Sequence, residues 1–328
     1  MRSILSKARL GSQLGGRPPV AVELSSPGVL AASSPGSPRT GFGSRGGSPE
    51  PGHPPVYAFE PLPEGALVGG IGEPNLRAPE VVTNAIRTAL GQVAPRTRSV
   101  TLVVPDTVVR VFVLDFDSLP GRAAEAIPIL RFRLRKTVPF DVEHAGVSYQ
   151  ILAETKTECK VLAAVIPGPI LQEYESAVRQ AGYEPGAVLP ASLAALGAIN
   201  SPEPALAANL SARTLTTSIA HGQDLLLYRT LELPADPGLR LEEVRRGVSV
   251  AAAYYEDKLG ARPSLLYYAG CGVGGGSTAE DFARLLNSPD SPDWAVVDLA
   301  PRPETGAATP LGNLVSLAGV TGALAGAA

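Results

Sequence analysis

The chain has 328 residues, of which 45 % are hydrophobic and 18 % are charged, and its formal net charge is -3. This length allows two domains of roughly 150 residues with sizeable cores, and the acidic balance gives no reason to expect nucleic acid as the main partner. The two cysteines, Cys159 and Cys271, form no CxxC pair and the three histidines lack metal-ligand spacing. This usage argues against a disulfide framework or a structural zinc site, and it fits a reducing cytosol.

The two ends of the chain give no sign of export or of a membrane span. Residues 1–17 are expected to form a flexible tail, and they contain no apolar core of the length that a signal peptide needs. Residues 311–328 are mostly small and apolar, but they include Asn313, Ser316 and Thr321 and fall short of the ~20 strongly apolar residues that cross a membrane. We therefore expect a terminal core helix there and no direct membrane span.

The first half of the chain alternates between strand-like and helix-like segments. A run rich in Ser, Pro and Gly at residues 33–55 cannot bury enough apolar surface to offset its ordering entropy, so we expect a mobile loop within the domain. Gly182 is placed to end the helix that precedes it. The strands expected here are residues 20–24, 56–59, 101–104 and 160–166, and the helices are residues 79–90, 169–181 and 189–199.

A small α/β module is expected at residues 105–157. Its helix carries Ile127, Leu130 and Leu134 on one face. The helix must end before Pro139, because proline disfavours a helical residue ahead of it. The strands expected in the module are residues 108–116 and 147–152, with a turn at residues 119–121.

The pattern restarts after residues 200–204, NSPEP, which we interpret as a domain boundary. A meander of three strands follows, with His221 and Gly222 in a hairpin turn. The longest helix comes next and ends at Gly260. Strands and helices continue to alternate, which favours a mixed α/β architecture. The strands expected in this half are residues 206–210, 215–220, 225–231, 264–269 and 295–299, and the helices are residues 239–259 and 278–286.

A glycine-rich turn follows the strand at residues 264–269. Gly270, Gly272 and Gly275 match the G-x-G-x-x-G pattern of dinucleotide-binding turns, and Asp298 ends the next strand, where a ribose-binding acid would lie. A dinucleotide-binding domain needs several more βαβ units, and only about 30 residues remain after Asp298. We therefore interpret these glycines as residues that let a strand turn into a helix.

Catalytic motifs are scarce: the sequence contains no G-x-S-x-G, no P-loop with its lysine and no H-E-x-x-H. Asp115 and Asp117 share one face of a strand, so they are either a carboxylate pair for acid–base chemistry or, as we interpret them, solvated edge positions. Arg131 and Arg135 share a helix face through their i, i+4 spacing. That face is either solvated or a docking surface for an acidic partner. No catalytic residue and no metal site is predicted.

Several segments occur in an order that resembles one protein family. VAVELSSPGVLAA stands where a first phosphate loop would lie, and ANLSARTLTTSIAHGQDLLLYR resembles a second phosphate hairpin. VVPDTVVRVFVLDFDSLP and ILRFRLRKTVPFDVEHAGVSYQIL resemble an inserted subdomain, and LLYYAGCGV resembles an adenosine-contacting turn. In this order the segments resemble the actin-like ATPase superfamily, and within it the PilM-type proteins of type IV pilus assembly.

The resemblance implies an α/β fold, namely an actin-like (ribonuclease H-like) two-domain fold with an inserted subdomain. A flexible tail would span residues 1–17, the first actin-like domain residues 18–200 and the second residues 201–328. The first domain would contain the mobile loop at 33–55 and the inserted subdomain at about 105–157. The segment KVLAAVIPGPILQEYESAVRQ would then return the chain to the first domain.

The resemblance also implies a nucleotide cleft. The family's loops usually supply carboxylates, glycines and a lysine, whereas Leu30 stands at the lysine position and Asn209 and Ser211 replace an acid and a glycine. Carboxylates normally hold magnesium and position water, so we expect a degenerate ATPase that does not hydrolyse its ligand. ATP with Mg²⁺ and no cofactor are both open. The residues expected to line the cleft are Glu23, Ser25, Ser26, Asn209, Ser211, Gly270 and Gly272.

The function implied by the resemblance is a cytoplasmic scaffold of a type IV pilus or a related type II secretion machine, peripheral to the inner membrane through a partner. The implied partner is the cytoplasmic tail of a bitopic, PilN-like inner-membrane protein, held in a groove between the first domain and the inserted subdomain. Arg131 and Arg135 would suit such an extended tail.

Two other functions remain as alternatives. One is a functional actin-fold ATPase or sugar kinase. The other is a polymerising, division-type homologue, which carries a C-terminal amphipathic anchor unlike the small apolar residues at 311–328. Self-association stays open.

Overall fold

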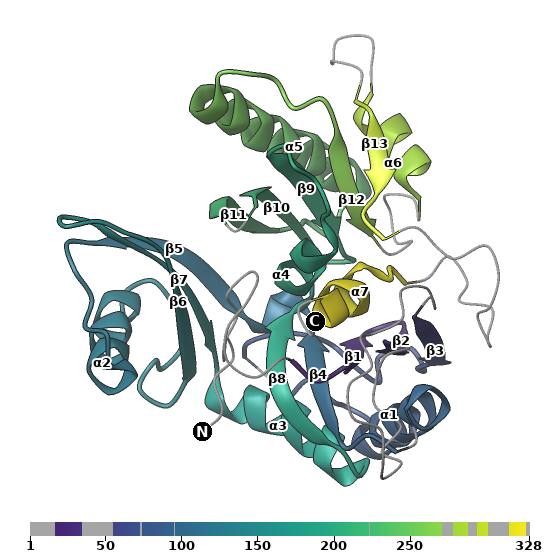
Figure 1. Cartoon of the computed structure of the whole chain (residues 1–328). Helices are drawn as coiled ribbons and strands as arrows, with labels where there is room; N and C mark the ends of the chain where they lie inside the picture. Colours follow the sequence, from purple (N-terminus) through teal and green to yellow (C-terminus); the bar gives the residue numbers. More distant parts are fainter. Residues whose placement is uncertain are drawn as a thin grey trace, which may run out of the picture.

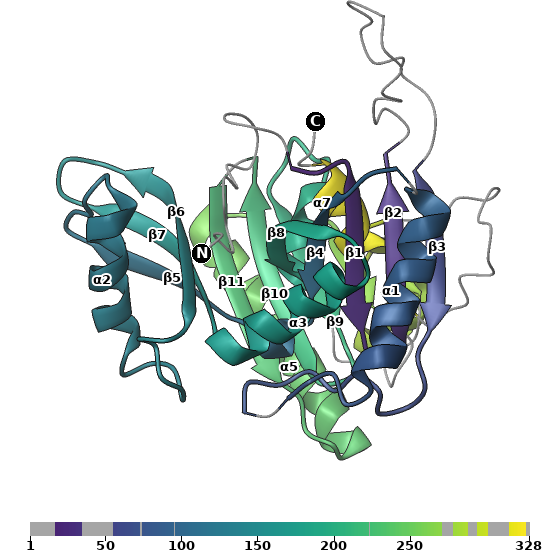
Figure 2. The ribbon, with the colours of Figure 1, turned by 90° about the horizontal axis from the view of Figure 1, so that it is seen from below.

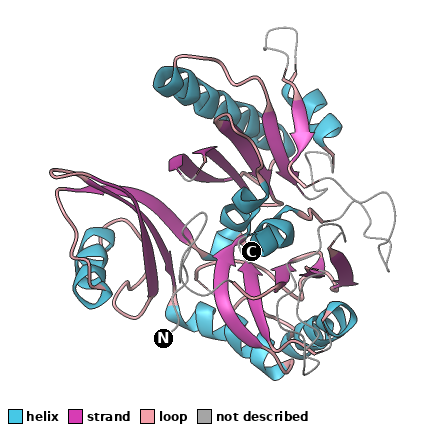
Figure 3. Cartoon of the chain, in the orientation of Figure 1, coloured by secondary structure: helices cyan, strands magenta, loops and turns pink. Residues whose placement is uncertain are grey.

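The computed structural model of the chain describes residues 17–34, 55–72, 74–94, 96–222, 224–270, 278–287, 294–300 and 315–325. Most of the expected tail, most of the expected loop at 33–55, and Gly272 and Gly275 lie outside this part. Each of two domains contains a five-stranded sheet, and a three-stranded sheet forms a subdomain that projects to one side (Figure 1, Figure 3).

The first domain is a sheet with helices on both faces. Its strands are β1 (Val20–Ser25), β2 (Gly28–Ser33), β3 (Val56–Pro61), β4 (Ser99–Val104) and β8 (Glu184–Pro190), and its helices are α1 (Pro79–Val93), α3 (Gly168–Gln180), α4 (Ala191–Ala195) and α7 (Ala318–Ala325). The strand order is β3-β2-β1-β4-β8, with β1, β4 and β8 parallel. α1 and α3 cover one face and α4 and α7 the other (Figure 2). Because both faces are buried, the central strands are almost wholly apolar.

Two strands of this sheet, β2 and β8, were not predicted from the sequence. β8 contains Pro185, Gly186 and Pro190, residue types that usually interrupt strands, but the strand lies at the sheet edge where proline is tolerated. The helix expected at 189–199 begins only at Ala191, because the two residues before it still pair with β4. α4 then continues as the 3₁₀ turn η2 (Leu196–Ala198).

The inserted subdomain is a three-stranded antiparallel sheet with one helix packed on it. The 3₁₀ turn η1 (Asp106–Val108) leads into it from the first domain, and its elements are β5 (Arg110–Phe116), α2 (Ala123–Leu134), β6 (Gly146–Glu154) and β7 (Cys159–Ile166). Leu130 and Leu134 of α2 are fully buried against the sheet. The central strand β7 pairs with both β5 and β6. Because β7 completes this sheet, we propose that the subdomain extends past the end predicted near residue 157 and ends at Ile166.

The second domain confirms the meander predicted at its start. Its elements are β9 (Ala205–Leu210), β10 (Thr214–His221), β11 (Asp224–Glu232), α5 (Pro237–Leu259), β12 (Leu266–Gly270), α6 (Ala279–Leu286) and β13 (Val296–Asp298). The strand order is β11-β10-β9-β12-β13. The Asp236 carboxylate accepts a hydrogen bond of 2.9 Å from the Leu239 N–H at the start of α5, and Gly260 ends the helix with φ of 69°.

The predicted terminal helix is present as α7, but it belongs to the first domain. Val320, Ala323 and Leu324 pack in one cluster with Ala21 and Leu30 of β1 and β2. The second domain therefore does not extend to residue 328 as a continuous unit, because the chain returns to the first domain (Figure 1). Within the described residues, no helix has both the length and the hydrophobicity needed to cross a membrane.

The close packing of α7 on α4 gives a test of this assignment. A Cβ atom added at Gly322 would lie 2.0 Å from the Ala194 carbonyl oxygen. We predict that Gly322→Ala lowers the free energy of unfolding by about 1–3 kcal/mol, the usual cost of overpacking. Gly91 of α1 is the matched control, because a Cβ atom there would meet nothing within 4 Å.

Chemical denaturation of both variants measures the difference. Gly91→Ala should raise the free energy of unfolding by roughly 0.5–1 kcal/mol, since alanine favours the helix more than glycine does. Equal effects of the two substitutions would contradict the packing of α7 on the first domain.

Candidate functional site

A cavity of about 480 Å³, which we call the interdomain cavity, lies between the two domains. The carboxyl ends of β1, β4, β9 and β12 border it, and this edge is where ligands bind in open α/β sheets. The start of α7 closes one side. The cavity brings together six of the residues predicted for a nucleotide cleft, which are Glu23, Ser25, Ser26, Asn209, Ser211 and Gly270. The seventh, Gly272, lies outside the described residues.

The first loop of the cavity is the turn between β1 and β2. The Ser25 hydroxyl donates a hydrogen bond of 2.9 Å to the Gly28 carbonyl oxygen and so closes the turn. A Cβ atom at Gly28 would lie 2.5 Å from the Glu60 carbonyl oxygen, so this position requires glycine. Ser26 is exposed at the cavity. Ser25 therefore has a structural role, and Ser26 offers its hydroxyl to a ligand.

The second loop is the turn between β9 and β10. The Ser211 hydroxyl oxygen accepts hydrogen bonds from the N–H groups of Arg213 at 3.2 Å and Thr214 at 2.9 Å, which fixes the turn. Asn209 lies in β9 opposite Thr216. Arg213 is exposed at the turn, and its guanidinium forms no hydrogen bond or ion pair with the other described residues. The second loop thus supplies the Asn209 amide and the unpaired Arg213 guanidinium, whereas the Ser211 hydroxyl already fixes the turn.

Two carboxyl groups of the first domain are buried at the cavity floor. The Oε2 atom of Glu23 has no hydrogen-bond partner within the described part of the chain. A Cβ atom at Gly319 of α7 would lie 2.3 Å from that oxygen, so only glycine leaves room for it. Burial, reinforced by the charge of Asp106, raises the pKa of Glu23 to about 8. The Glu23 side chain is therefore largely protonated near neutral pH.

Asp106 connects the first domain to the second through a chain of hydrogen bonds. Its carboxylate accepts hydrogen bonds from the Ser192 N–H at 3.1 Å and the Ser192 hydroxyl at 2.6 Å. The Ser192 oxygen in turn accepts from the Tyr228 hydroxyl of β11. Burial raises the pKa of Asp106 to about 6, and the hydrogen bonds from Ser192 oppose that rise. The sequence prediction missed all three residues, although an acid directly after a buried strand is a signal for Asp106.

The donor set of the interdomain cavity does not fit a dedicated magnesium site. Within the described residues, no group of three or more His, Cys, Asp or Glu side chains is placed to hold a metal ion. Asn209 carries no charge, and both carboxyl groups, the half-buried Glu23 with its covered Oε2 atom and the buried Asp106, come from the first domain. The phosphates of a nucleotide fit better, because Ser26 and the Arg213 guanidinium face the cavity.

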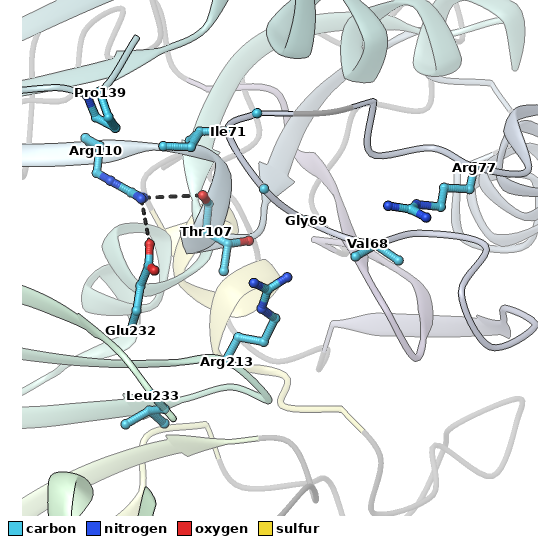
Figure 4. A pocket seen from close by; sticks show the side chains of 12 residues that line it. Val68, Gly69, Ile71, Arg77, Thr107, Arg110, Pro139, Arg213, Glu232 and Leu233 are labelled. Atoms are coloured by element: carbon cyan, nitrogen blue, oxygen red, sulfur yellow. Dashed lines mark hydrogen bonds and ion pairs between the residues drawn. The ribbon is translucent and has the colours of Figure 1, made fainter. Parts of the chain in front are cut away.

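A second cavity of about 490 Å³, which we call the junction cavity, lies where the two domains and the inserted subdomain meet. Arg110 at the start of β5 forms an ion pair of 2.7 Å with Glu232 of β11 and donates to the Thr107 carbonyl oxygen at 3.3 Å. Arg213 points toward Thr107 from the second domain, and Arg77 lies on the far side (Figure 4). Thr107 and Arg213 line both cavities.

The basic docking face predicted at Arg131 and Arg135 is only partly available. The Arg131 guanidinium donates hydrogen bonds to the carbonyl oxygens of Val142, Glu143 and Ala145, so it holds the loop before β6 in place. Arg135 remains exposed. The i, i+4 spacing gave the shared helix face but not these backbone partners, and the docking role of the two arginines stays a prediction.

Two other interpretations from the sequence fit the geometry. Asp115 is exposed and lies 3.4 Å from Lys160, as expected for a solvated edge position. A Cβ atom at Gly270 would lie 1.9 Å from the Tyr268 hydroxyl oxygen, so packing explains this glycine. Asp298 accepts a hydrogen bond of 3.1 Å from the Ala279 N–H at the start of α6, which is a structural role.

No family model and no curated protein matches the chain. Among solved structures, the chain is similar to a PilM–PilN type IV pilus biogenesis complex, with a TM-score of 0.64, 17 % identity, and coverage of 94 % of this chain and 98 % of that chain. It also matches the cytoplasmic domain of EpsL, an inner-membrane component of the Vibrio cholerae type II secretion system, with a TM-score of 0.45, 13 % identity and coverage of 76 % and 81 %. The chain has the predicted actin-like two-domain α/β fold, and it shares that fold with the pilus protein.

The buried Glu23 generates a prediction on pH dependence. Its pKa rises from 4.5 to about 8 on folding, so in this window the folded chain holds a proton that the unfolded chain has lost. The stability that the protonated Glu23 contributes is fully present below about pH 4.5 and is lost as the pH rises through about 8. We predict that the free energy of unfolding falls less between about pH 5 and pH 8.5 in Glu23→Gln than in the wild type.

Denaturant titrations at the two pH values measure this effect. Asp117→Asn is the matched control, because Asp117 is exposed. Its pH dependence should equal that of the wild type. If Glu23→Gln also keeps the wild-type pH dependence, Glu23 is not protonated in the folded chain.

Proposed function

We propose that the chain is a scaffold of a type IV pilus or related secretion machine, and that it binds the cytoplasmic tail of a PilN-like inner-membrane protein. The observation that carries this proposal is the fold match to a PilM–PilN complex over 94 % of this chain and 98 % of the other. In this proposal the chain is cytoplasmic, and its partner holds it at the inner membrane.

The junction cavity is the site that we propose for the tail. Residues 68–72 form one wall and include Gly69, Gly70 and Gly72, which let a peptide backbone approach closely. Ile71 and Leu233 supply apolar surface for side chains. A wall of this kind suits an extended peptide, whose affinity comes from backbone hydrogen bonds and a few side-chain pockets.

The glycine wall is held in place before any ligand binds. The buried Asn75 accepts a hydrogen bond of 2.6 Å from the Gly70 N–H and donates one of 3.0 Å to the Gly70 carbonyl oxygen. The Glu173 carboxylate accepts hydrogen bonds from the N–H groups of Asn75 at 2.9 Å and Leu76 at 2.7 Å. A wall that is already ordered reduces the entropy lost on binding, which supports the junction cavity as the peptide site.

The interdomain cavity is the site that we propose for a nucleotide, bound but not hydrolysed. Ser26 and the unpaired Arg213 would hold the phosphates from the two domains. Hydrolysis needs a metal and a positioned base, and the cavity offers neutral Asn209 where a carboxylate would act. Arg213 would supply positive charge that a metal ion supplies in an active ATPase.

The tail-binding proposal predicts a specific loss of affinity. The probe is a fluorescent peptide with the N-terminal cytoplasmic sequence of the PilN-like protein from the same organism, titrated with the full chain and followed by anisotropy. We predict that Ile71→Asp weakens binding by at least about tenfold, which corresponds to ~1.4 kcal/mol, because it places a charge on an apolar wall.

Val81→Asp is the control, because it makes the same kind of change at an exposed position of α1 away from the cavity. It should bind like the wild type. The proposal fails if the peptide does not bind the wild-type chain, or if it binds Ile71→Asp and wild type equally well.

The nucleotide proposal predicts stabilisation by ATP that does not need magnesium. ATP at about 100 times its Kd should stabilise the folded chain by ~2.7 kcal/mol, seen as a raised Tm with EDTA present. Arg213→Ala should lose this shift. Arg229→Ala, an exposed arginine of β11 outside the cavity, should keep it.

Phosphate release with ATP and Mg²⁺ is the companion measurement, and none is expected. Turnover by the wild type would support the alternative of a functional ATPase or kinase. A Tm shift that appears only with Mg²⁺ would refute the role of Arg213.

A further inference from the structure

The outward face of α2 combines an exposed aromatic ring with several cations. Phe132 is 79 % exposed, the highest value among the large hydrophobic side chains of the described residues, and Ile129 is 39 % exposed. The opposite side of the helix is buried through Leu130 and Leu134. α2 is therefore apolar on two sides, and only one of them is used in folding.

This face is basic, although the chain as a whole is acidic. Residues 122–136 contain five basic residues and one acidic residue, in a chain whose net charge is -3. Arg133, Arg135 and Lys136 are exposed. Within the described residues, neither Arg133 nor Lys136 forms an ion pair or a side-chain hydrogen bond.

Helical spacing places these residues together. Ile129 and Phe132 are three residues apart and Ile129 and Arg133 four apart, so each pair lies side by side on the surface of α2, while Arg135 and Lys136 follow directly after its last residue, Leu134. We call Ile129, Phe132, Arg133, Arg135 and Lys136 the α2 outer face. The exposed ring is thus surrounded by positive charge.

The α2 outer face points away from the rest of the molecule. α2 covers the side of the inserted subdomain that lies farthest from the two domains (Figure 1, Figure 2). On the other side of the sheet, Val111, Val113 and Leu162 belong to a cluster with Leu225 and Tyr228 of the second domain. The subdomain is therefore packed against the second domain at its inner side, and α2 lies on its outer side.

We propose that the α2 outer face binds the surface of a membrane that contains anionic phospholipid. Arg133, Arg135 and Lys136 complement the phosphates of the headgroups, and Phe132 enters the boundary between headgroups and acyl chains. A flat membrane can reach a helix on the outer side of the subdomain without any matching groove. The inference does not rest on the proposed function, because it concerns the chain alone and a lipid surface.

The size of the face favours a membrane over an acidic protein. α2 has 12 residues, and its exposed side is a single helix face. A stable protein interface buries roughly 800 Å² on each partner, which is more than one such face supplies. A lipid contact needs no such area, because the cations and the exposed ring each contribute to it separately.

Vesicle flotation of the purified full chain tests the proposal. The probes are vesicles of phosphatidylcholine and vesicles of equimolar phosphatidylcholine and phosphatidylglycerol, at low and at physiological salt. The wild type should float with the anionic vesicles and not with the neutral ones, and the bound fraction should fall as salt rises.

Two variants separate the contributions of the ring and the charges. Phe132→Ser should lower the bound fraction by roughly threefold, and the double variant Arg133→Glu with Lys136→Glu should lower it by roughly tenfold or more. Leu239→Ser is the control for the ring, because Leu239 is 55 % exposed on α5 of the second domain. Arg229→Glu is the control for the charge, and both controls should float like the wild type.

A wild-type chain that stays in solution with both kinds of vesicle overturns the proposal and leaves an acidic protein as the occupant of the face. Vesicle binding that the α2 variants do not change overturns it as well. Circular dichroism of each variant shows that the substitutions leave the fold intact, so a lost interaction is assigned to the face itself.

Discussion

The three parts of the chain meet at one buried carboxylate, that of Asp106. It lies between β4 of the first domain and β5, the first strand of the inserted subdomain. Taking a carboxylate out of water is costly unless hydrogen bonds compensate, and Ser192 donates two. Tyr228 completes the chain from the second domain, and burial together with the charge of Asp106 raises its pKa well above its usual value, so its hydroxyl stays a donor. One polar network thus links the two domains at the point where the chain enters the inserted subdomain.

The sequence predicted the fold where local pattern decides structure. The apolar periodicity of residues 79–90, 169–181 and 239–259 matches α1, α3 and α5, because each helix buries one face. β8 was missed because its prolines and glycine look like a turn, and its strand conformation depends on pairing with β4. The return of α7 to the first domain is a contact across the whole chain, which periodicity within a segment cannot reveal.

The sequence predicted which loops form the candidate site, but it did not predict the hydrogen bonds that join distant segments there. Glu23 and Asn209 meet at one cavity because both lie near the carboxyl ends of parallel strands, and motif order was enough to place them there. The contact from Ser192 to Asp106 joins residues 86 positions apart, and nothing in either segment indicates the other. Arg131 shows the same limit: spacing gives the face of a side chain, but its carbonyl partners come from the loop before β6.

The distribution of charge in the interdomain cavity suits a bound polyphosphate better than a bridging metal ion. A metal ion that bridges two domains needs negative ligands from both, yet Glu23 and Asp106 lie on the same domain and the second domain contributes Asn209 and Arg213. A polyphosphate between Ser26 and Arg213 would draw the domains together without placing a metal or a base for hydrolysis. Arg213 and Thr107 also line the junction cavity, so closure on a nucleotide would move residues that border the proposed tail site. In the proposed function such a cleft would regulate the scaffold through its shape, and that role would need the binding residues and not the catalytic ones.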